Sequence, residues 1–332
     1  SVSASLRGTV APMTPADAAA ARFVGRLAVI ILAYNEAPHI ERAIRSAQRA
    51  AAEVIVVDSF STDRTVDLAR SLGAKALQHA FVTQAQQFQW ALDSLPIDAE
   101  WVMRLDADEI LTPELAEEIR RRLPELPPDV TGVNLKRRHI FLGRWIKHGG
   151  RYPLTLLRIW RRGAARVEQR WMDEHMALLH GRAVTFEHDF SDHNLNDLTF
   201  FTDKHNKYAT REAIDVAMRR YGLAAVDEAL TCESDSRQAA KRWVKERVYN
   251  RLPFWLGPLG YFLTRYFIQL GFLDGREGLI YHFLQAFWYR FLVGAKALEL
   301  DRALKSLASS DARLVALSRL TGYALGDLQR RP

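Results

Sequence analysis

Cysteine is almost absent from this chain. Cys232 is the single cysteine among 332 residues, which excludes an internal disulfide and a cysteine-based zinc site and fits a reducing compartment. The histidines at 175, 180, 188 and 193 lack the short helical spacing and the companion glutamate of zinc proteases. We therefore expect no zinc centre of that kind.

Long apolar runs are missing as well. None of the apolar runs in the last third of the chain reaches about 18 uncharged residues, the length that a simple transmembrane helix needs. Residues 1–26 are rich in Ala, Ser and Thr without a long apolar core, so they do not resemble a secretory signal. We expect a flexible N-terminal extension there.

Glycine-rich phosphate loops and nucleic-acid-binding modules are also absent. The charge balance is basic, with 46 Lys and Arg against 39 Asp and Glu, a net charge of +7 and a sequence pI of about 9.6. A basic chain suits anionic partners. Because no nucleic-acid module is present, we expect no nucleic acid among them, which leaves pyrophosphate-bearing substrates and anionic lipid.

Strand-like runs that end in polar residues are what the sequence does contain. Residues 27–32, 54–57 and 101–105 form largely apolar runs, which predict strands covered on both faces. Helical patterns separate them at 38–51, 62–72 and 83–95, and 75–78 is a further short strand. Such repeats predict a doubly wound α/β sheet, which binds ligands where its strands end. The side chains expected at these ends are Tyr34, Glu36, Asp58, Asp106 and Asp108.

The triplet Asp106-Ala107-Asp108 places two carboxylates directly after the third apolar strand. Magnesium and manganese prefer hard oxygen ligands and commonly complete their shells with substrate phosphates and water. The triplet therefore indicates a divalent cation that holds a diphosphate. The alternative is ordinary loop chemistry, because Asp and Asn also cap helices and form turns.

Four ordered motifs together resemble family 2 glycosyltransferases of the GT-A fold. They are Ile-Leu-Ala-Tyr-Asn-Glu at 31–36, Val-Val-Asp-Ser-Phe-Ser-Thr-Asp-Arg-Thr at 56–65, Gln86-Gln87, and Trp-Val-Met-Arg-Leu-Asp-Ala-Asp-Glu at 101–109. The resemblance is greatest to the bacterial branch of lipopolysaccharide-core and exopolysaccharide enzymes. It covers residues 26–125 and continues more loosely to about residue 300. It implies a Rossmann-like, mostly parallel sheet with flanking helices.

The resemblance also implies roles for individual residues. Nucleotide-binding positions would be Ala33, Tyr34, Glu36, Asp58, Gln87, Asp106 and Ala107. Among these, Asp58 would bind the base, usually uracil, and Asp106 the ribose or the metal. The residues around Gln87 depart from the family pattern. Mg²⁺ or Mn²⁺ would be held by Asp106 and Asp108, with His193 as a third ligand or a donor-phosphate contact; a structural role for His193 is the alternative.

An acceptor-activating base is expected downstream of the metal motif. Inverting transfer is a single displacement in which a carboxylate removes the acceptor hydroxyl proton. The segment Trp171-Met-Asp-Glu-His175 supplies Glu174, with Asp173 as the second choice. Either carboxylate could instead pair with Arg166 or Arg170. Strands at 132–138 and 154–160 would extend the sheet into the acceptor half.

The last third of the chain has a different composition. Residues 237–251 hold six Lys and Arg against one Glu, and aromatic-rich segments follow at 252–263, 266–273 and 279–289. Aromatic rings beside cations are typical of an element that lies on an anionic membrane surface. The alternative is a helical subdomain that packs its aromatic residues internally.

The sequence therefore predicts four regions: an extension at 1–26, a nucleotide-sugar-binding half at 27–125, an acceptor-binding half at 126–200, and a helical membrane-surface region at 201–332. The function expected is metal-dependent, inverting transfer from a nucleotide sugar to a lipid-linked or lipopolysaccharide acceptor, and the family resemblance implies UDP as the nucleotide. The expected location is peripheral, at the cytoplasmic face of a bacterial inner membrane. The alternatives are a nucleotidyl or phosphoryl transferase with two-metal chemistry, and a non-catalytic lipid-binding scaffold.

Overall fold

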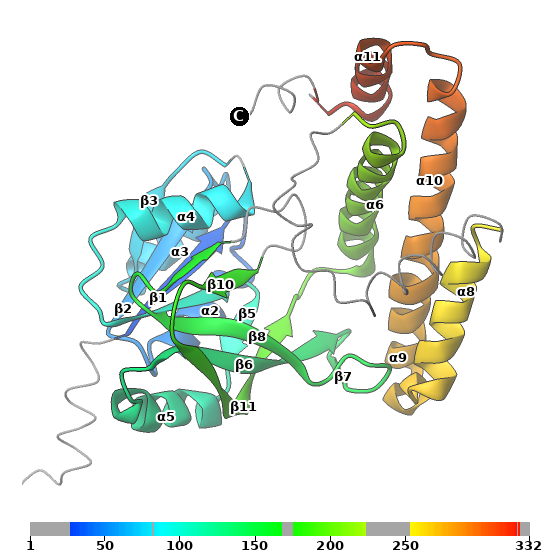
Figure 1. The fold of residues 1–332 in the computed structure, drawn as a ribbon. Coiled ribbons are helices and arrows are strands. Elements are labelled where there is room, and N and C mark those ends of the chain that lie inside the picture. Colours follow the sequence, from blue (N-terminus) through cyan, green and yellow to red (C-terminus); the bar gives the residue numbers. More distant parts are fainter. Residues whose placement is uncertain (1–26, 82, 168–174, 224–252, 324, 326–332) are drawn as a thin grey trace, which may run out of the picture. The chain divides into compact units, whose positions relative to one another are not determined.

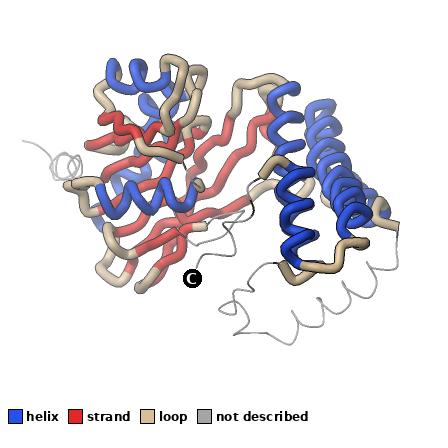
Figure 2. Tube along the Cα trace, turned by 90° about the horizontal axis from the view of Figure 1, so that it is seen from above, coloured by secondary structure: helices blue, strands red, loops and turns tan. Residues whose placement is uncertain are grey.

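The computed structural model describes residues 27–81, 83–167, 175–223, 253–323 and 325. Internal contacts divide the chain into two compact units. The α/β unit consists of residues 1–145 and 151–195, and the helical unit consists of residues 146–150 and 196–332. Figures 1 and 2 show the strands gathered in the first unit and the long helices in the second. The basic segment 237–251 lies outside the described residues.

One mixed sheet forms the frame of the α/β unit. Within the described residues it has nine strands. Their order is β3 (Lys75–Gln78), β2 (Glu53–Asp58), β1 (Leu27–Ala33), β4 (Trp101–Asp106), β8 (Leu154–Arg161), β6 (Val130–Phe141), β11 (Arg182–His193) and β5 (Glu109–Leu111), with β7 (Arg144–Ile146) paired to β6.

The predicted parallel arrangement holds for one half of this sheet. Strands β3, β2, β1 and β4 are mutually parallel, as the repeated strand and helix patterns predicted. Beyond β4 the prediction of a mostly parallel sheet is wrong, because β8 runs antiparallel to both β4 and β6. Strand β11 is parallel to β6, and β5 is antiparallel to β11. Antiparallel neighbours need no crossover helix between them, and none separates β6 from β8.

Helices cover both faces of the sheet. Alternate residues of a strand point to opposite faces, so Val29 and Ile31 pack with α2 (Ile40–Ala47), α3 (Thr65–Ser71) and α5 (Pro113–Arg122). Ala28 and Ile30 pack on the other side with α4 (Gln84–Ser94) and with the ribbon of β9 (Ala165–Val167) and β10 (Met176–Leu178). A short helical turn, η1 (Leu123–Glu125), follows α5.

The helical unit contains α6 (Leu198–Arg220), a long helix that lies mostly in the region 201–332 predicted to be helical. Asp197 caps it by accepting a hydrogen bond from the Phe200 amide at 2.9 Å. Ala213 and Ile214 of α6 share a core with Leu300 and Leu304 of α10 (Tyr289–Leu304) and with Leu317 of α11 (Ser310–Thr321). Figure 1 shows α6 beside α10.

The other helical segments described in this unit are α8 (Leu256–Leu263), η3 (Thr264–Ile268), η4 (Gly271–Asp274), α9 (Gly275–His282) and η5 (Phe283–Trp288). Across the described part of the chain, no helix is both long enough and apolar enough to span a bilayer.

Candidate active site

The predicted strand ends do lie side by side in the α/β unit. The register pairs Ala33 with Asp58 and Asp58 with Gln78. On the other side of β1, Leu32 pairs with Asp106. The carboxyl ends of the four parallel strands therefore form one edge, where such sheets bind ligands.

Hydrogen bonds join the two loops that follow β1 and β2. The Asn35 amide donates to Ser61 Oγ at 2.8 Å, and Asn35 Oδ1 accepts from the Thr62 amide at 2.8 Å. Asn35 has a φ of 54°, a left-handed conformation that Asn tolerates better than most residues. Sequence analysis gave Asn35 no role, although its place in the first motif was a signal.

Asp63 makes a second connection between these loops. Its Oδ2 accepts from the Ala37 amide at 3.0 Å, and its Oδ1 accepts from the amide of Thr65 at 2.9 Å and from its hydroxyl at 2.5 Å. Thr65 Oγ1 in turn accepts from the Glu36 amide at 2.8 Å. Burial opposes ionisation, but these hydrogen bonds outweigh it and hold the pKa of Asp63 below its usual value.

These contacts also explain a shorter helix than the sequence predicted. A helix beginning at residue 62 was expected, but α3 begins at Thr65 without a side-chain cap. Residues 61–63 are held instead by Asn35, Asp58 and Ala37. Local side-chain bonds of this kind compete with helical ones.

Asp58, the residue expected to bind the base, is fully buried. Its Oδ2 accepts from the Ser61 amide at 2.8 Å and from Gln78 Nε2 at 3.1 Å, and its Oδ1 accepts from the Ser61 hydroxyl. Its contact with a base stays a prediction, and in this structure the carboxylate shapes the loop after β2.

Gln87 is also buried, and it joins α4 to the loops after β2 and β3. Its Nε2 donates to Ser59 Oγ and to the His79 carbonyl, both at 3.1 Å, while Oε1 lies 2.7 Å from His79 Nδ1. The His79 ring stacks on Trp90. These contacts hold the loops after β2 and β3 in place. A contact of Gln87 with the sugar donor stays a prediction.

Two aromatic side chains stand exposed at this edge. Tyr34 follows β1 and is 57% exposed, and Phe60 follows β2 and is 55% exposed. Phe60 has a φ of 61°, a conformation that costs about 1–2 kcal/mol for a residue with a side chain. Tyr34 was expected to line the nucleotide pocket. Phe60 was missed, because sequence pattern does not reveal backbone strain.

Asp106 ends β4 within a cluster of opposite charges. Arg104 Nε lies 3.3 Å from its Oδ1, and Arg158 Nη2 of β8 lies 3.7 Å from its Oδ2. Burial opposes ionisation, but the two arginines outweigh it and hold the pKa of Asp106 below its usual value. Asp106 is therefore an ionised carboxylate that is 30% exposed.

Glu109 lies behind Asp106 and is buried. Its Oε2 accepts from the Asp106 amide at 2.9 Å, and its Oε1 accepts from Arg158 Nη2 at 2.6 Å. Burial raises the pKa of Glu109 to about 8 despite Arg158, and Asp106 and Asp192 act in the same direction. The glutamate thus orients Arg158 and the turn after β4. Sequence analysis did not single out either residue, since they are 49 positions apart.

Asp108 contacts the segment that ends β11. Its Oδ2 accepts from Asn194 Nδ2 at 3.0 Å, and its carbonyl accepts from the His193 amide at 2.9 Å. These contacts bring the backbones of Asp108 and His193 together, and their shared binding of a metal stays a prediction. Ala107, between the two aspartates, is buried.

Arg42 of α2 reaches His193 from the other side. Its Nη2 donates to the His193 carbonyl at 2.6 Å, and its Nη1 lies 3.3 Å from His193 Nδ1. Burial and the Arg42 charge lower the pKa of His193, so the ring is neutral at pH 7. Neutral imidazole is the form that binds metals.

Glu36 and His39, just before α2, connect the start of this helix to the segment that follows β11. His39 is buried, and its Nε2 accepts from the Leu195 amide at 2.8 Å. Its hydrogen must then lie on Nδ1, which donates to Glu36 Oε2 at 2.6 Å. Glu36 is thus engaged with His39, and its expected contact with the nucleotide stays a prediction.

No group of three His, Cys, Asp or Glu side chains arranged to hold a metal occurs within the described ranges. Asp106, Asp108 and His193 are neighbours but do not form a complete centre by themselves. Glu174 and Asp173 lie outside the described residues, as does Arg170. The predicted base therefore stays a prediction.

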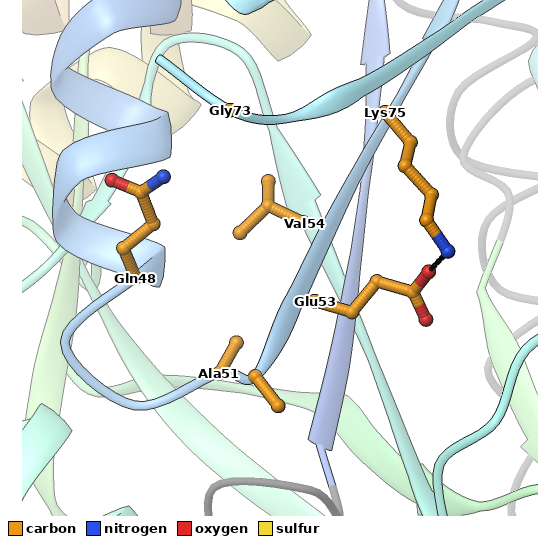
Figure 3. Close-up of a pocket in the computed structure, with 7 residues that line it drawn as sticks. Gln48, Ala51, Glu53, Val54, Gly73 and Lys75 are labelled. Atoms are coloured by element: carbon orange, nitrogen blue, oxygen red, sulfur yellow. Dashed lines mark hydrogen bonds and ion pairs between the residues drawn. The ribbon is translucent and has the colours of Figure 1, made fainter.

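A pocket of about 310 Å³ lies elsewhere in the α/β unit, at the strand starts. Glu53 and Lys75, the first residues of β2 and β3, line it together with Gln48, Val54 and Gly73. Figure 3 shows the ion pair between Lys75 Nζ and Glu53 at its side. Because it is at the amino ends of the strands, this pocket is separate from the candidate site.

Comparison with known proteins gives a family and several relatives. The model for "Glycosyl transferase family 2" matches residues 28–193. An uncharacterized glycosyltransferase of Rickettsia bellii is 45% identical over 94 residues, covering 28% of this chain and 31% of the relative. The lipopolysaccharide core biosynthesis glycosyltransferase LpsC of Rhizobium meliloti is 30% identical over 150 residues, covering 43% and 53%. The matches thus span about a third of the Rickettsia relative and about half of LpsC.

Two solved structures are similar to parts of this chain. Glucosyl-3-phosphoglycerate synthase of Mycobacterium tuberculosis, in complex with Mn²⁺ and UDP, has a TM-score of 0.30 and 23% identity over 37% of this chain and 47% of its own. TarS of S. aureus has a TM-score of 0.37 and 14% identity over 56% and 39%. The family match covers half of the chain and contains every strand of the mixed sheet except the first residue of β1. The chain belongs to glycosyl transferase family 2.

Proposed function

We propose that this protein is a metal-dependent, inverting glycosyltransferase. It takes a sugar from a nucleotide sugar, with UDP as the nucleotide, and transfers it to a lipid-linked or lipopolysaccharide acceptor. The observation that carries the proposal is that the family match at 28–193 includes the whole edge with Asp58, Asp106, Asp108 and His193. LpsC, whose name places it in lipopolysaccharide core biosynthesis, supports the acceptor class.

The residues at the edge suit a divalent cation. Carboxylate oxygens are ligands that Mg²⁺ and Mn²⁺ prefer, and neutral imidazole is the form of histidine that binds metals. Asp106 and Asp108 would be the cation's carboxylate ligands; Asp108 accepts a hydrogen bond from the Asn194 amide, and two arginines contact Asp106. When bound, the cation would supply charge neutralisation at the departing nucleoside diphosphate.

The protein's own residues then orient the donor. The linked loops after β1 and β2 would hold the nucleotide, with Tyr34 and Phe60 presenting exposed rings at the edge. Arg42 and Asn194 hold His193 and Asp108 in place. Glu174, or Asp173, would accept the proton of the acceptor hydroxyl, which makes the reaction a single displacement. Because the acceptor is lipid-borne, the enzyme would work peripherally at the cytoplasmic face of the inner membrane.

Substitution of Asp108 by Asn tests the metal site. UDP titrations of D108N should show no gain in affinity when Mn²⁺ is added, whereas the wild type should bind UDP at least about tenfold more tightly with Mn²⁺ than with EDTA. D67N, at an exposed site on α3, is the matched control and should behave like the wild type. A metal-dependent gain that survives in D108N would contradict the assignment.

Turnover separates this proposal from its alternatives. Release of UDP together with a glycosylated product supports a glycosyltransferase. Attachment of the nucleotide itself to the acceptor would favour a nucleotidyl transferase, and binding of nucleotide without any turnover would favour a scaffold.

A further inference from the structure

One turn of the helical unit exposes an unusual number of apolar side chains. From the end of η3 into η4, at residues 267–273, five of seven consecutive residues are exposed and apolar. Ile268 is 77% exposed and Phe267 is 54% exposed. We call this surface the apolar turn; its members are Phe267, Ile268, Leu270, Phe272 and Leu273. Exposed apolar groups gathered in this way mark interaction surfaces in soluble proteins.

The backbone of the apolar turn is fixed. The Gln269 amide donates to the Thr264 carbonyl at 2.9 Å, and the Leu273 amide donates to the Leu270 carbonyl at 3.0 Å. Leu270 between them has a φ of 61°, a left-handed conformation that is rare for leucine. A strained conformation persists only where the surroundings impose it. The fixed backbone therefore holds the side chains of the apolar turn in their exposed positions.

Residues 146–150 belong to the same unit and hold the apolar turn by hydrogen bonds. The Gly149 amide donates to the Gln269 carbonyl at 2.8 Å, and the buried Arg265 donates from Nε to the Gly149 carbonyl at 2.6 Å. The buried Asp274 accepts from the amide of His148 at 2.8 Å and lies 2.7 Å from its Nδ1.

Close packing also holds the apolar turn in place. A Cβ added at Gly271 would lie 2.7 Å from the buried His282 ring, and one at Gly149 would lie 2.2 Å from it. Only glycine fits at these two positions, so the polar and packed side of the turn faces inward while the apolar side faces out.

The chemistry of the apolar turn favours a lipid bilayer as its partner. Leucine, isoleucine and phenylalanine enter a bilayer favourably, whereas protein-binding hot spots are enriched in Trp, Tyr and Arg and depleted in Leu. The exposed cation Arg276 follows η4 in the sequence, and the exposed Lys147 precedes His148, which contacts Asp274. The chain also carries a net charge of +7, which complements anionic lipid.

We propose that the apolar turn inserts into the interfacial layer of an anionic membrane and docks the protein there. The inference rests on the proposed function, since it names the surface by which the enzyme would reach a lipid-borne acceptor. Apolar faces of interfacial elements enter about 5–10 Å into the boundary between headgroups and chains. Insertion to that depth requires no membrane-spanning helix.

Vesicle binding by the full chain tests the docking surface. Flotation with phosphatidylglycerol–phosphatidylcholine vesicles should show binding by the wild type and a loss of about tenfold or more in the F267S/I268N double variant. V315S, which changes a 69% exposed valine on α11, is the matched control and should bind like the wild type. Equal binding by the double variant would overturn the proposal.

A second measurement does not depend on the fold of that variant. The single native cysteine allows an environment-sensitive dye to be placed at I268C or V315C in a C232S background. The dye at 268 should shift to the blue on vesicle addition, and the dye at 315 should not. A shift at neither site would overturn the proposal. So would a wild-type oligomer that becomes monomeric in F267S/I268N, because the turn would then be a contact between copies.

These experiments use no substrate. The proposed function is measured without vesicles, by UDP binding and by sugar transfer to a water-soluble acceptor. Failure of the docking proposal is therefore distinguishable from failure of the proposed function.

Discussion

Replacement of Glu118 by Gln should destabilise the α/β unit far more than its isosteric nature suggests. Glu118 is buried on α5, opposite an irregular stretch of β11. The pairing of β11 with β6 is interrupted between Thr185 and Asp189, and a bulge leaves amides without ladder partners. Glu118 accepts two of these amides: Oε1 and Oε2 lie 2.9 and 3.1 Å from the Glu187 nitrogen, and Oε2 lies 2.9 Å from that of His188.

Further donors surround the same carboxylate. Arg122 Nη1 donates to Oε1 at 2.6 Å, and His188 Nδ1 lies 2.9 Å from Oε2. Both oxygens therefore face donors. An ionised carboxylate only accepts hydrogen bonds, whereas either orientation of a glutamine amide turns an NH₂ group toward N–H groups. Leaving buried donors unsatisfied costs about 1–3 kcal/mol, so we expect E118Q to lose about 2–3 kcal/mol at pH 7.

The pH dependence gives this prediction a second test. Burial raises the pKa of Glu118, but the amides of Glu187 and His188, with the side chains of His188 and Arg122, outweigh burial and lower it below its ordinary value of 4.5. A lowered pKa in the folded state contributes stability above the unfolded pKa, and that stability is lost as pH falls through the folded value. The difference between wild type and E118Q should therefore be full at pH 7 and shrink below about pH 4.5.

Thermal and urea unfolding at pH 7 and in acid would measure this. The expected loss corresponds to a fall in Tm of roughly 4–10 °C. E117Q is the control, because Glu117 is on the same helix but is 69% exposed and lies 3.6 Å from Arg120. Surface pairs of this kind contribute about 0–1 kcal/mol. Equal effects of E118Q and E117Q, or a difference that persists unchanged in acid, would refute the reasoning.

Two further predictions concern function. D63A should weaken UDP binding about three- to tenfold, because the Ala37 and Thr65 amides lose their acceptor and the two edge loops separate. Calorimetric titration would measure the Kd for UDP. An unchanged Kd would mean that the loops are held without Asp63. E174Q should keep UDP binding, but its rate of sugar transfer should fall about 100-fold or more, as expected for loss of a general base. Near-normal turnover in E174Q together with loss of turnover in D173N would assign the base to Asp173.

The parallel half of the sheet could be predicted from sequence because its strands carry one unambiguous signal. Strand β1 has no charged residue and β2 is apolar between its ends. Runs of that kind fit only strands covered on both faces. Once those strands are placed, Asp58 and Asp106 must lie at the same edge, and the observed register confirms this. The family resemblance is confirmed by the match at 28–193.

Other parts depended on contacts between residues far apart in the chain. Nothing local marks Arg158 as a partner of Asp106 and Glu109, or Arg42 as a partner of His193. Strand β5 has three residues, too few for a periodic signal, and exists because it pairs with β11. The beginning of α3 was misjudged for the same reason, since Asn35 lies 27 positions before the residue that it holds.

The placement of β8 and β5 has a consequence for how this fold can be divided. Residues 101–111 contribute β4 and β5, yet β4 is bordered by β8 and β5 by β11, which come 43 and 71 positions after the end of β5. A fragment that stopped near residue 125 would leave the buried flank of β4 as an open edge, ready to pair with another chain. Recombination between relatives at that point would instead place a foreign β8 beside β4, whereas exchange of the whole sheet would keep the acidic turn together with the arginine that contacts it.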